Sequence, residues 1–252
     1  MSAGVRQTTG VPTDAPRSPI WARPEPSSRA PRFSRERIAA AALEIADAEG
    51  IEAVSMRNVA ARLGAGTMTL YNYVETKDEL FALMDDALMA EAVVPDGELP
   101  ADWREATATI ARRTWAVLAR HPWAITLRQG PALGPNAMYH FEQSLAALSD
   151  TGLGLAARFD VLATVDAYVF GSALKAAEMR GSAETHRADV EAIIAYGMQQ
   201  LATGRFPHTS ALLGGRDPRD ADVGGPPTDP AGIEAQFERG LQAVLDGVAG
   251  WI

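Results

Sequence analysis

Apolar residues recur every three or four positions along most of the chain, which is the spacing of an amphipathic α-helix. The stretch from Ser34 to Gly50 places Ile38, Ala42 and Ile45 on one face of such a helix. Serine often caps a helix start, and glycine often stands just past a helix end. No stretch alternates apolar and polar residues with the period of two that is typical of a strand. The sequence therefore predicts an all-α fold.

The same spacing and the residue types at the segment ends predict the other helices. Ser55, Thr67 and Thr76 are the expected N-caps, and Glu79 forms a capping box with Thr76. A short helix with Pro122 in its first turn is also expected. The longer helices are expected over residues 55–63, 67–74, 76–94, 102–120, 135–150, 155–180, 184–203 and 233–252.

Composition divides the chain into three parts. Residues 1–31 are rich in Pro, Ser, Arg and Thr and lack apolar periodicity, so we expect a disordered arm. The turn-forming stretch "PDGELPAD" separates a smaller helical domain, residues 32–94, from a larger one, residues 95–252. Gly and Pro pairs predict a mobile loop at about residues 205–230 of the larger domain.

Charge and cysteine content narrow the classes of function. The net charge is −9, but residues 1–80 carry ten basic and ten acidic residues, so the acidic excess lies in residues 81–252. Residues 1–37 hold seven arginines against three acidic residues, and a basic segment attracts phosphate. The chain has no cysteine, which excludes disulfides, thiolate catalysis and cysteine zinc sites. Without an apolar run of about 18 residues or a signal peptide, a cytoplasmic protein with no membrane partner is expected.

Residues 55–74 contain two short expected helices joined by a turn with glycine, which is the arrangement of a helix-turn-helix motif. The second helix is almost uncharged and mixes hydroxyl, amide, thioether and aromatic side chains. Such a helix suits the DNA major groove, about 12 Å wide, where it offers donors, acceptors and apolar contacts for thymine methyl groups. Leu70 and Val74 are expected to face the other helices. The alternative is a helical hairpin of a larger bundle that contacts no DNA.

Candidate DNA contacts follow from this placement. The ammonium of Lys77 and the free backbone N–H groups at the start of its helix are expected to share one phosphate. Ser55 and Arg57 begin the first helix of the motif and are expected to meet the DNA backbone on the other side. The expected groove-facing residues are Thr67, Met68, Thr69, Tyr71 and Asn72.

The segment "SMRNVAARLGAGTMTLYNYVETKDEL" resembles the DNA-binding segment of the TetR family of bacterial repressors. The resemblance rests on the Leu-Gly corner, the Thr-Leu-Tyr core and the Lys followed by an acidic residue and Leu, and it covers residues 33 to about 92. The stretches "FEQSLAAL", "DAYVFGSAL" and "FERGLQAVLDGV" resemble more weakly the C-terminal region of the tetracycline repressor branch. The resemblance implies a three-helix DNA-binding head, with Tyr73 also facing DNA. It further implies a homodimer on a palindromic, double-stranded operator, released by a small molecule.

The larger domain carries candidate ligand contacts. Aromatic, thioether and polar side chains gather in its expected helices, and a mostly apolar cavity with a few polar anchors would suit a flat hydrophobic molecule. For each side chain the alternative is ordinary core packing. The candidates are Trp103, Trp115, Trp123, Met138, His140, Phe141, Gln143, Tyr168 and Met179.

Small residues in two of the expected helices predict a subunit interface. Glycine and alanine three or four positions apart let helices approach closely, so two helices from each of two subunits would form a four-helix interface. The alternative is that these helices pack within one chain. The candidates are Gly171, Ala173, Ala176, Gly240, Val244 and Gly247.

These observations predict a ligand-responsive DNA-binding transcriptional regulator, in particular a repressor released by a small hydrophobic molecule. Two alternatives remain: a helix-turn-helix protein without an effector, and a helical-bundle enzyme. Catalysis requires a convergent set of reactive groups, and the sequence supplies no Glu-x-x-His pair and only scattered histidines at positions 121, 140, 186 and 208. No catalytic residue, cofactor or metal site is therefore expected.

Overall fold

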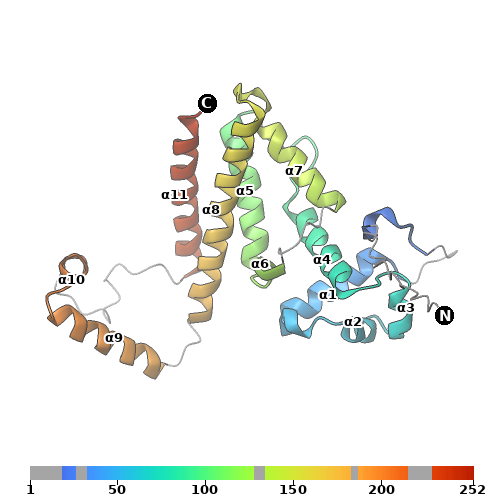
Figure 1. The fold of residues 1–252 in the computed structure, drawn as a ribbon, viewed down its shortest axis with the longest axis horizontal. Helices are drawn as coiled ribbons and strands as arrows, with labels where there is room; N and C mark the ends of the chain where they lie inside the picture. Colours follow the sequence, from blue (N-terminus) through green and yellow to red (C-terminus); the bar gives the residue numbers. More distant parts are fainter. Residues whose placement is uncertain (1–18, 27–32, 128–133, 183–186, 215–228) are drawn as a thin grey trace, which may run out of the picture.

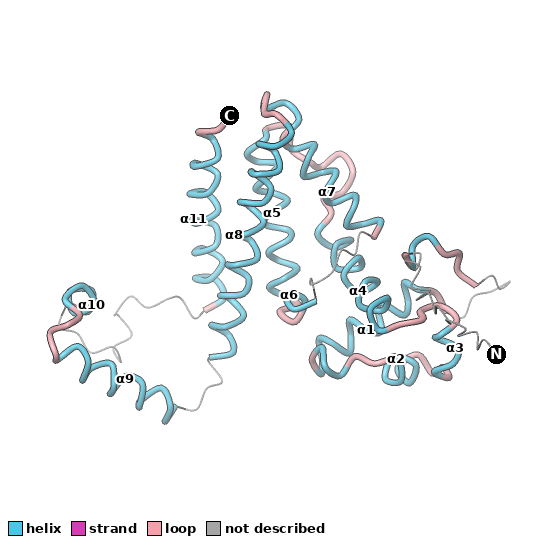
Figure 2. Tube along the Cα trace, in the orientation of Figure 1, coloured by secondary structure: helices cyan, strands magenta, loops and turns pink. Residues whose placement is uncertain are grey.

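The computed structural model describes residues 19–26, 33–127, 134–182, 187–214 and 229–252 (Figures 1 and 2). These residues form helices joined by turns, with no strand among them, which confirms the all-α prediction. The N-terminal part contains η1 (Ile20–Ala22), α1 (Arg35–Glu49), η2 (Ile51–Ala53), α2 (Met56–Arg62), α3 (Thr67–Tyr71) and α4 (Lys77–Ala92). The remainder contains α5 (Trp103–Arg120), α6 (Ala124–Leu127), α7 (Pro135–Ala147), η3 (Ser149–Thr151), α8 (Leu155–Ser182), α9 (Arg187–Ala202), α10 (Pro207–Leu213) and α11 (Pro230–Ala249).

Hydroxyl side chains begin the helices of the N-terminal part. Ser34 Oγ accepts from the backbone N–H of Arg37 in α1, and Ser55 Oγ accepts in the same way at α2. Thr76 caps α4 by accepting from the backbone N–H of Glu79 at 3.1 Å. The prediction that Thr67 is an N-cap is wrong, because Gly66 occupies that position and Thr67 is the first helical residue of α3.

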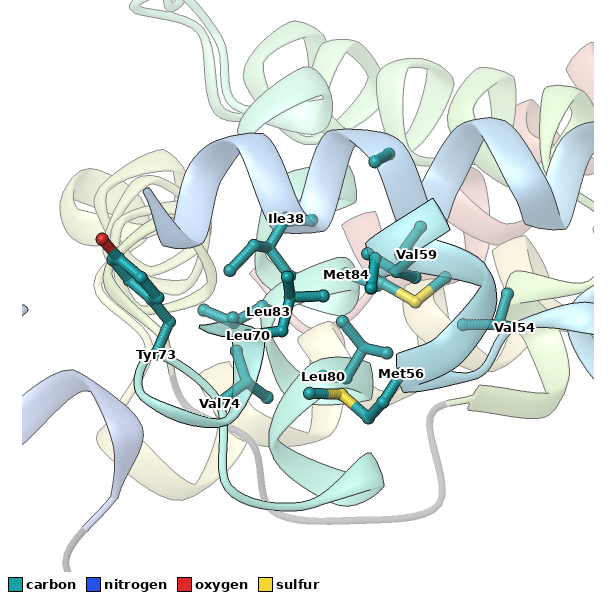
Figure 3. Close-up of a cluster of buried hydrophobic side chains, with 14 of the residues drawn as sticks. Ile38, Val54, Met56, Val59, Leu70, Tyr73, Val74, Leu80, Leu83 and Met84 are labelled. Carbon is teal, nitrogen blue, oxygen red and sulfur yellow. The ribbon is translucent and has the colours of Figure 1, made fainter. Parts of the chain in front are cut away.

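The first core lies between α1, α2, α3 and the first half of α4, a unit that we call the head. Leu70 and Val74 are fully buried in this core, as predicted, together with Ile38 and Leu80 (Figure 3). Glycines at positive φ, 85° at Gly50 and 63° at Gly64, end α1 and α2. These sharp stops allow three short helices to cross one another around a small core.

The second core belongs to the remaining helices, which we call the body. It joins α4, α5, α8 and α11, with Phe237 and Leu241 of α11 buried against α5 and α8. The helix α4 contributes to both cores, since Leu83 and Met84 belong to the head and Leu88 belongs to the body. The head and the body are therefore connected by one continuous helix (Figure 1).

Two segments are more ordered than their composition predicts. Within the expected disordered arm, residues 19–26 pack on the head and bury Ile20 in its core. Within the expected loop at residues 205–230, α10 forms at Pro207–Leu213, with Pro207 in its first turn. Residues 1–18, 27–31 and 215–228 of these two predictions lie outside the described residues. Both ordered segments are too short to produce a visible apolar period.

Candidate nucleic-acid interface and ligand cavity

The short helix α3 presents an unusual mixture of side chains to solvent. Met68 is 77% exposed and Tyr71 is 41% exposed, although α3 is anchored by a fully buried Leu70. Thr67 and Thr69 are half-buried, and Asn72 is exposed directly after the helix. A helix that buries one side and displays apolar, aromatic, hydroxyl and amide groups on the other has the chemistry needed to contact base edges.

Polar groups next to α3 extend this surface. Lys77 is the first residue of α4 and is exposed, with its ammonium 4.9 Å from the centre of the Phe81 ring. Arg57 is exposed in the first turn of α2, and Ser55 is half-buried because its hydroxyl caps that helix. A lysine beside the free N–H groups of a helix start is suited to bind phosphate. The surface around α3 can therefore bind both bases and backbone.

The predicted DNA contact of Tyr73 is wrong. Its side chain is only 8% exposed and belongs to the head core, at the edge of which it lies (Figure 3). Its backbone carbonyl accepts a hydrogen bond from Arg35 Nε at 3.2 Å. The reason is geometric, since α3 ends at Tyr71 and the chain turns after Asn72, its C-cap, toward α4.

The body contains an open cavity of about 680 Å³ between α5, α8 and α11. Its floor is a stack of rings, with Trp115 and Phe237 centroids 4.6 Å apart and Tyr168 and Phe237 centroids 5.7 Å apart. An ion pair of 3.1 Å between Lys175 and Glu178 supplies charge to the wall. The lining residues are Trp115, Ala167, Tyr168, Gly171, Ser172, Lys175, Glu178, Met179, Ile233, Gln236 and Phe237.

Polar groups on the cavity floor are held in different ways. The Tyr168 hydroxyl donates to the carbonyl of Phe237 at 2.7 Å, and burial raises the pKa of Tyr168 above its ordinary value. The indole N–H of Trp115 is buried and has no hydrogen-bond partner. A buried donor without an acceptor costs free energy until an acceptor arrives. The cavity thus offers aromatic faces, and one of the rings that line it carries a buried, unsatisfied donor.

An ion pair fixes α5 to α11 beside this cavity. Arg112 of α5 donates from two nitrogens to the carboxylate of Glu238 in α11, at 2.9 and 2.7 Å. These hydrogen bonds lower the pKa of Glu238 to about 2 and raise the pKa of Arg112. The pair therefore remains charged across the physiological pH range.

Comparison with known proteins identifies the family of both parts of the chain. Residues 38–84 match the bacterial regulatory proteins of the tetR family, and residues 95–251 match the tetracyclin repressor-like C-terminal domain. The chain belongs to the TetR family. It is therefore a DNA-binding transcriptional regulator, and the family assignment made from the motif is confirmed.

Several TetR-family relatives align over most of the chain. The HTH-type transcriptional repressor DrrR1 of Streptomyces coeruleorubidus is 37% identical over 91% of this chain and 83% of its own. An HTH-type transcriptional regulator of Saccharopolyspora erythraea is 34% identical over 91% of both chains. The Streptomyces coelicolor TetR family protein ActR, in its complex with actinorhodin, has a TM-score of 0.66 and 27% identity over 88% of this chain and 98% of its own.

The TetR-family body brings only some of the predicted ligand contacts together. Trp115, Tyr168 and Met179 line the cavity, as the sequence predicts. Phe237 and Ile233 also line the cavity but were not predicted as ligand contacts. They are regularly spaced apolar residues of an amphipathic helix, and nothing in the sequence distinguishes them from core residues. The polar lining residues of α8 were missed for a similar reason, because charged side chains on a long helix usually face only solvent.

The other predicted ligand contacts lie elsewhere. Trp123 packs between head and body and donates to Asp47 of α1 at 2.8 Å. Gln143 is buried in α7 and exchanges two hydrogen bonds, 2.7 and 3.0 Å, with the backbone of Val94. Trp103 is half-buried between two clusters of the body. These three residues join parts of the protein and do not line the cavity.

Three predicted contacts lie on α7, away from the cavity. His140 Nε2 lies 2.9 Å from Thr114 Oγ1, beside a cleft of about 10 Å³ between α5, α7 and α8. That volume is about the minimum for one water molecule. Met138 and Phe141 are exposed, and the Phe141 ring lies 6.0 Å from that of Phe159. These α7 side chains therefore do not share the cavity of Trp115, and their contact with a ligand stays a prediction.

The predicted subunit contacts divide in the same way. Ala173 and Ala176 are fully buried in their own chain, and Val244 is partly buried there. A Cβ atom on Gly240 would lie 2.0 Å from the Tyr168 hydroxyl, so this glycine permits a contact within the chain. For the buried Ala173 and Ala176 the prediction of a subunit contact is wrong, whereas for the partly buried Val244 and Gly240 it stays a prediction. Gly171 and Gly247 have open space around them.

Metal-binding clusters and membrane-spanning helices are both absent from the part of the chain that the structure describes. Among these residues, no group of three or more histidine, cysteine, aspartate or glutamate side chains could hold a metal ion. None of the described helices is both long and apolar enough to cross a membrane.

Proposed function

We propose that this TetR-family protein is a repressor that binds a palindromic operator as a homodimer and is released by a flat, mostly hydrophobic molecule. The exposed surface of α3 carries the DNA-binding half of the proposal. Met68, Tyr71 and Asn72 contact bases, Thr67 and Thr69 add hydroxyl contacts at the edges, and Lys77 binds phosphate. Ser55 and Arg57 hold the neighbouring phosphates from the start of α2.

The cavity between α5, α8 and α11 is the effector site. A planar molecule packs against the rings of Trp115, Tyr168 and Phe237. ActR has been solved with (S)-DNPA and with actinorhodin, which supports a small-molecule effector for this chain as well. We therefore expect a polycyclic aromatic compound.

The exposed face of α8 and α11 forms the homodimer. Gly171 and Gly247 leave open space on these two helices, and Leu174 is exposed between small residues of α8. Small and apolar residues on a solvent-facing pair of helices fit a second copy of the same surface. Two copies of α3 are then held about 34 Å apart, the separation of successive major grooves.

The effector acts on the head through α4, which belongs to both cores. Asp86 of α4 accepts hydrogen bonds from the backbone N–H groups of Asn136 and Ala137 at the start of α7, at 2.9 and 3.0 Å. Asp47 of α1 accepts from His121 and Trp123, which follow α5. A shift of α7 therefore reaches α4 through Asp86, and a shift of the end of α5 reaches α1 through Asp47. Coupling of about 1 to 3 kcal/mol would weaken operator binding about 5- to 150-fold.

The test is release of DNA by a ligand. Compounds that raise the melting temperature are identified in a thermal-shift screen of polycyclic aromatic molecules, and each is added to the protein bound to a selected, fluorescently labelled operator. We expect a compound that stabilises the protein to lower operator affinity within the 5- to 150-fold range. Stabilising compounds that leave operator affinity unchanged would support the alternative of a DNA-binding protein without an effector.

A further inference from the structure

A segment outside the matched family domain is part of the DNA-binding head. The tetR-family match begins at residue 38, yet residues 19–26, which we call the N-terminal segment, pack on the same core. Ile20 is 3% exposed in that core, and Trp21 packs against it from the rim. Burial removes the apolar surface of the isoleucine side chain from water, which stabilises this contact. The N-terminal segment is therefore held firmly against the head.

One buried guanidinium connects the N-terminal segment to the end of α3. Arg35 Nη1 donates to the carbonyls of Ile20 and Arg23, both at 2.7 Å. Arg35 Nε donates to the carbonyl of Tyr73 at 3.2 Å, directly after the exposed α3 surface. The planar fork of arginine fixes all three carbonyls relative to one another. The position of α3 therefore depends on the N-terminal segment.

A second arginine changes the charge at the start of α4. Arg23 forms ion pairs with Glu75 and Glu79, and its Nη2 lies 2.6 Å from the Glu79 carboxylate, as an ion pair without hydrogen-bond alignment. The Arg23 side chain is only 24% exposed, so the solvent screens this pair less than a fully exposed one. Lys77 and Asp78 lie between these two glutamates in the sequence. Without Arg23, Lys77 would be the one cation among the five residues 75–79, against three carboxylates.

We propose that the N-terminal segment is a functional element of the DNA interface. Arg35 is a positioning residue that fixes the turn after α3. Arg23 neutralises the carboxylates of Glu75 and Glu79, so that a DNA phosphate can approach Lys77. Repulsion between a phosphate and an unpaired carboxylate would otherwise oppose binding over distances up to about 10 Å at moderate salt. This inference rests on the proposed function, because it requires α3 and Lys77 to face DNA.

The main test is the Arg23→Gln substitution, read as operator affinity by fluorescence anisotropy at several salt concentrations. We expect affinity to fall about 5- to 20-fold at low salt and less at high salt, because salt screens the exposed carboxylates. Arg62→Gln is the matched control, since Arg62 also bridges two glutamates of the head, Glu44 and Glu49, at 3.1 and 3.5 Å. Arg62 pairs with α1 and lies on α2, away from the start of α4, so its loss should change affinity less than about twofold.

A rescue variant separates charge from folding. Adding Glu75→Gln to Arg23→Gln removes one of the two carboxylates that Arg23 neutralises, so affinity should rise at least about twofold above that of Arg23→Gln. If Arg23 only held the segment in place, the second substitution would not restore binding. Melting temperatures of all variants, measured beside the titrations, identify any variant that has unfolded.

Two truncations test the segment as a whole. A chain that begins at residue 27 should bind the operator at least about tenfold more weakly than a chain that begins at residue 19, since the shorter chain lacks Arg23 and two of the three carbonyl partners of Arg35. Equal affinities of the two chains, or an Arg23→Gln variant that binds as tightly as the original at low salt, would overturn this inference. If the unaltered protein selects no DNA at all, the proposed function is wrong instead.

Discussion

The head and the body use their aromatic and apolar side chains in opposite ways. In the head, Met68 and Tyr71 remain in solvent on a short helix that is anchored by one buried leucine. In the body, Trp115, Tyr168 and Phe237 turn inward from three helices and leave a cavity beside their rings. The comparison teaches that a DNA-reading surface can be built from neighbouring residues, whereas a ligand site must be assembled from distant parts of the chain.

The largest effect is expected from removing a ring at the floor of the body cavity. Phe237→Ala deletes a side chain that is 3% exposed and stacks on two others, so the free energy of unfolding should fall by about 3 to 5 kcal/mol. Urea unfolding of the purified variant measures this change. Met68→Ala in the head serves as the control, because its side chain is 77% exposed and its loss should cost less than about 0.5 kcal/mol. Similar losses for both variants would contradict the comparison.

Removal of an aromatic side chain from the head should act on DNA and leave stability unchanged. Tyr71→Ala is expected to weaken operator binding about 100-fold, since contacts to bases contribute roughly 1 to 3 kcal/mol each. Gel-shift titration measures the affinity, and analytical ultracentrifugation confirms that assembly is unchanged. Tyr139→Ala is the matched control, because Tyr139 is similarly exposed on α7 of the body. A Tyr71→Ala variant that shifts operator DNA at the original concentrations would contradict the assignment of α3.

A smaller effect is expected for the tryptophan ring that lines the cavity. Trp115→Phe keeps an aromatic ring but reduces the area that can stack on a bound molecule, so effector affinity should fall about 3- to 10-fold. Calorimetric titration with a compound from the thermal-shift screen measures that affinity. Trp123→Phe is the control, because Trp123 donates to Asp47 outside the cavity. If Trp123→Phe weakened effector binding more than Trp115→Phe, the effector site would have to be moved.

The smallest effect concerns pH and the ion pair between α5 and α11. Hydrogen bonds from Arg112 hold the pKa of Glu238 at about 2, below its ordinary value of 4.5. The stabilisation from the folded carboxylate is therefore complete above pH 4.5 and is lost as the pH falls toward 2. Both side chains are more than a third exposed, so the effect should stay below about 1 kcal/mol. In melting curves from pH 7 to pH 3, Glu238→Gln should show less loss of stability than the original protein.

Local signals made the head predictable. Ser34, Ser55 and Thr76 cap their helices through contacts within three residues, and such contacts can be identified from sequence alone. Tyr73 was misplaced because it lies just past the end of α3, where one residue of turn reverses the facing direction. The N-terminal segment was missed because a single buried isoleucine produces no periodic pattern.

The body was predictable as helices but not as a site. Apolar spacing predicts α5, α8 and α11, yet it does not indicate which face of each helix meets the others. Ala173 and Ala176 illustrate this ambiguity, since small residues permit close packing with a helix of either the same chain or a partner. Gly240 illustrates it further, because its role depends on Tyr168, which lies 72 positions earlier in the sequence.

Selection of bound duplexes from a random DNA pool tests the central claim most directly. The account predicts a single enriched sequence with two-fold symmetry, whose half-sites lie about 34 Å apart, one helical turn of DNA. It also predicts that Tyr71→Ala and Asn72→Ala fail to enrich that sequence. Recovery of no preferred sequence, or equal enrichment by these variants, would contradict the claim that α3 reads DNA.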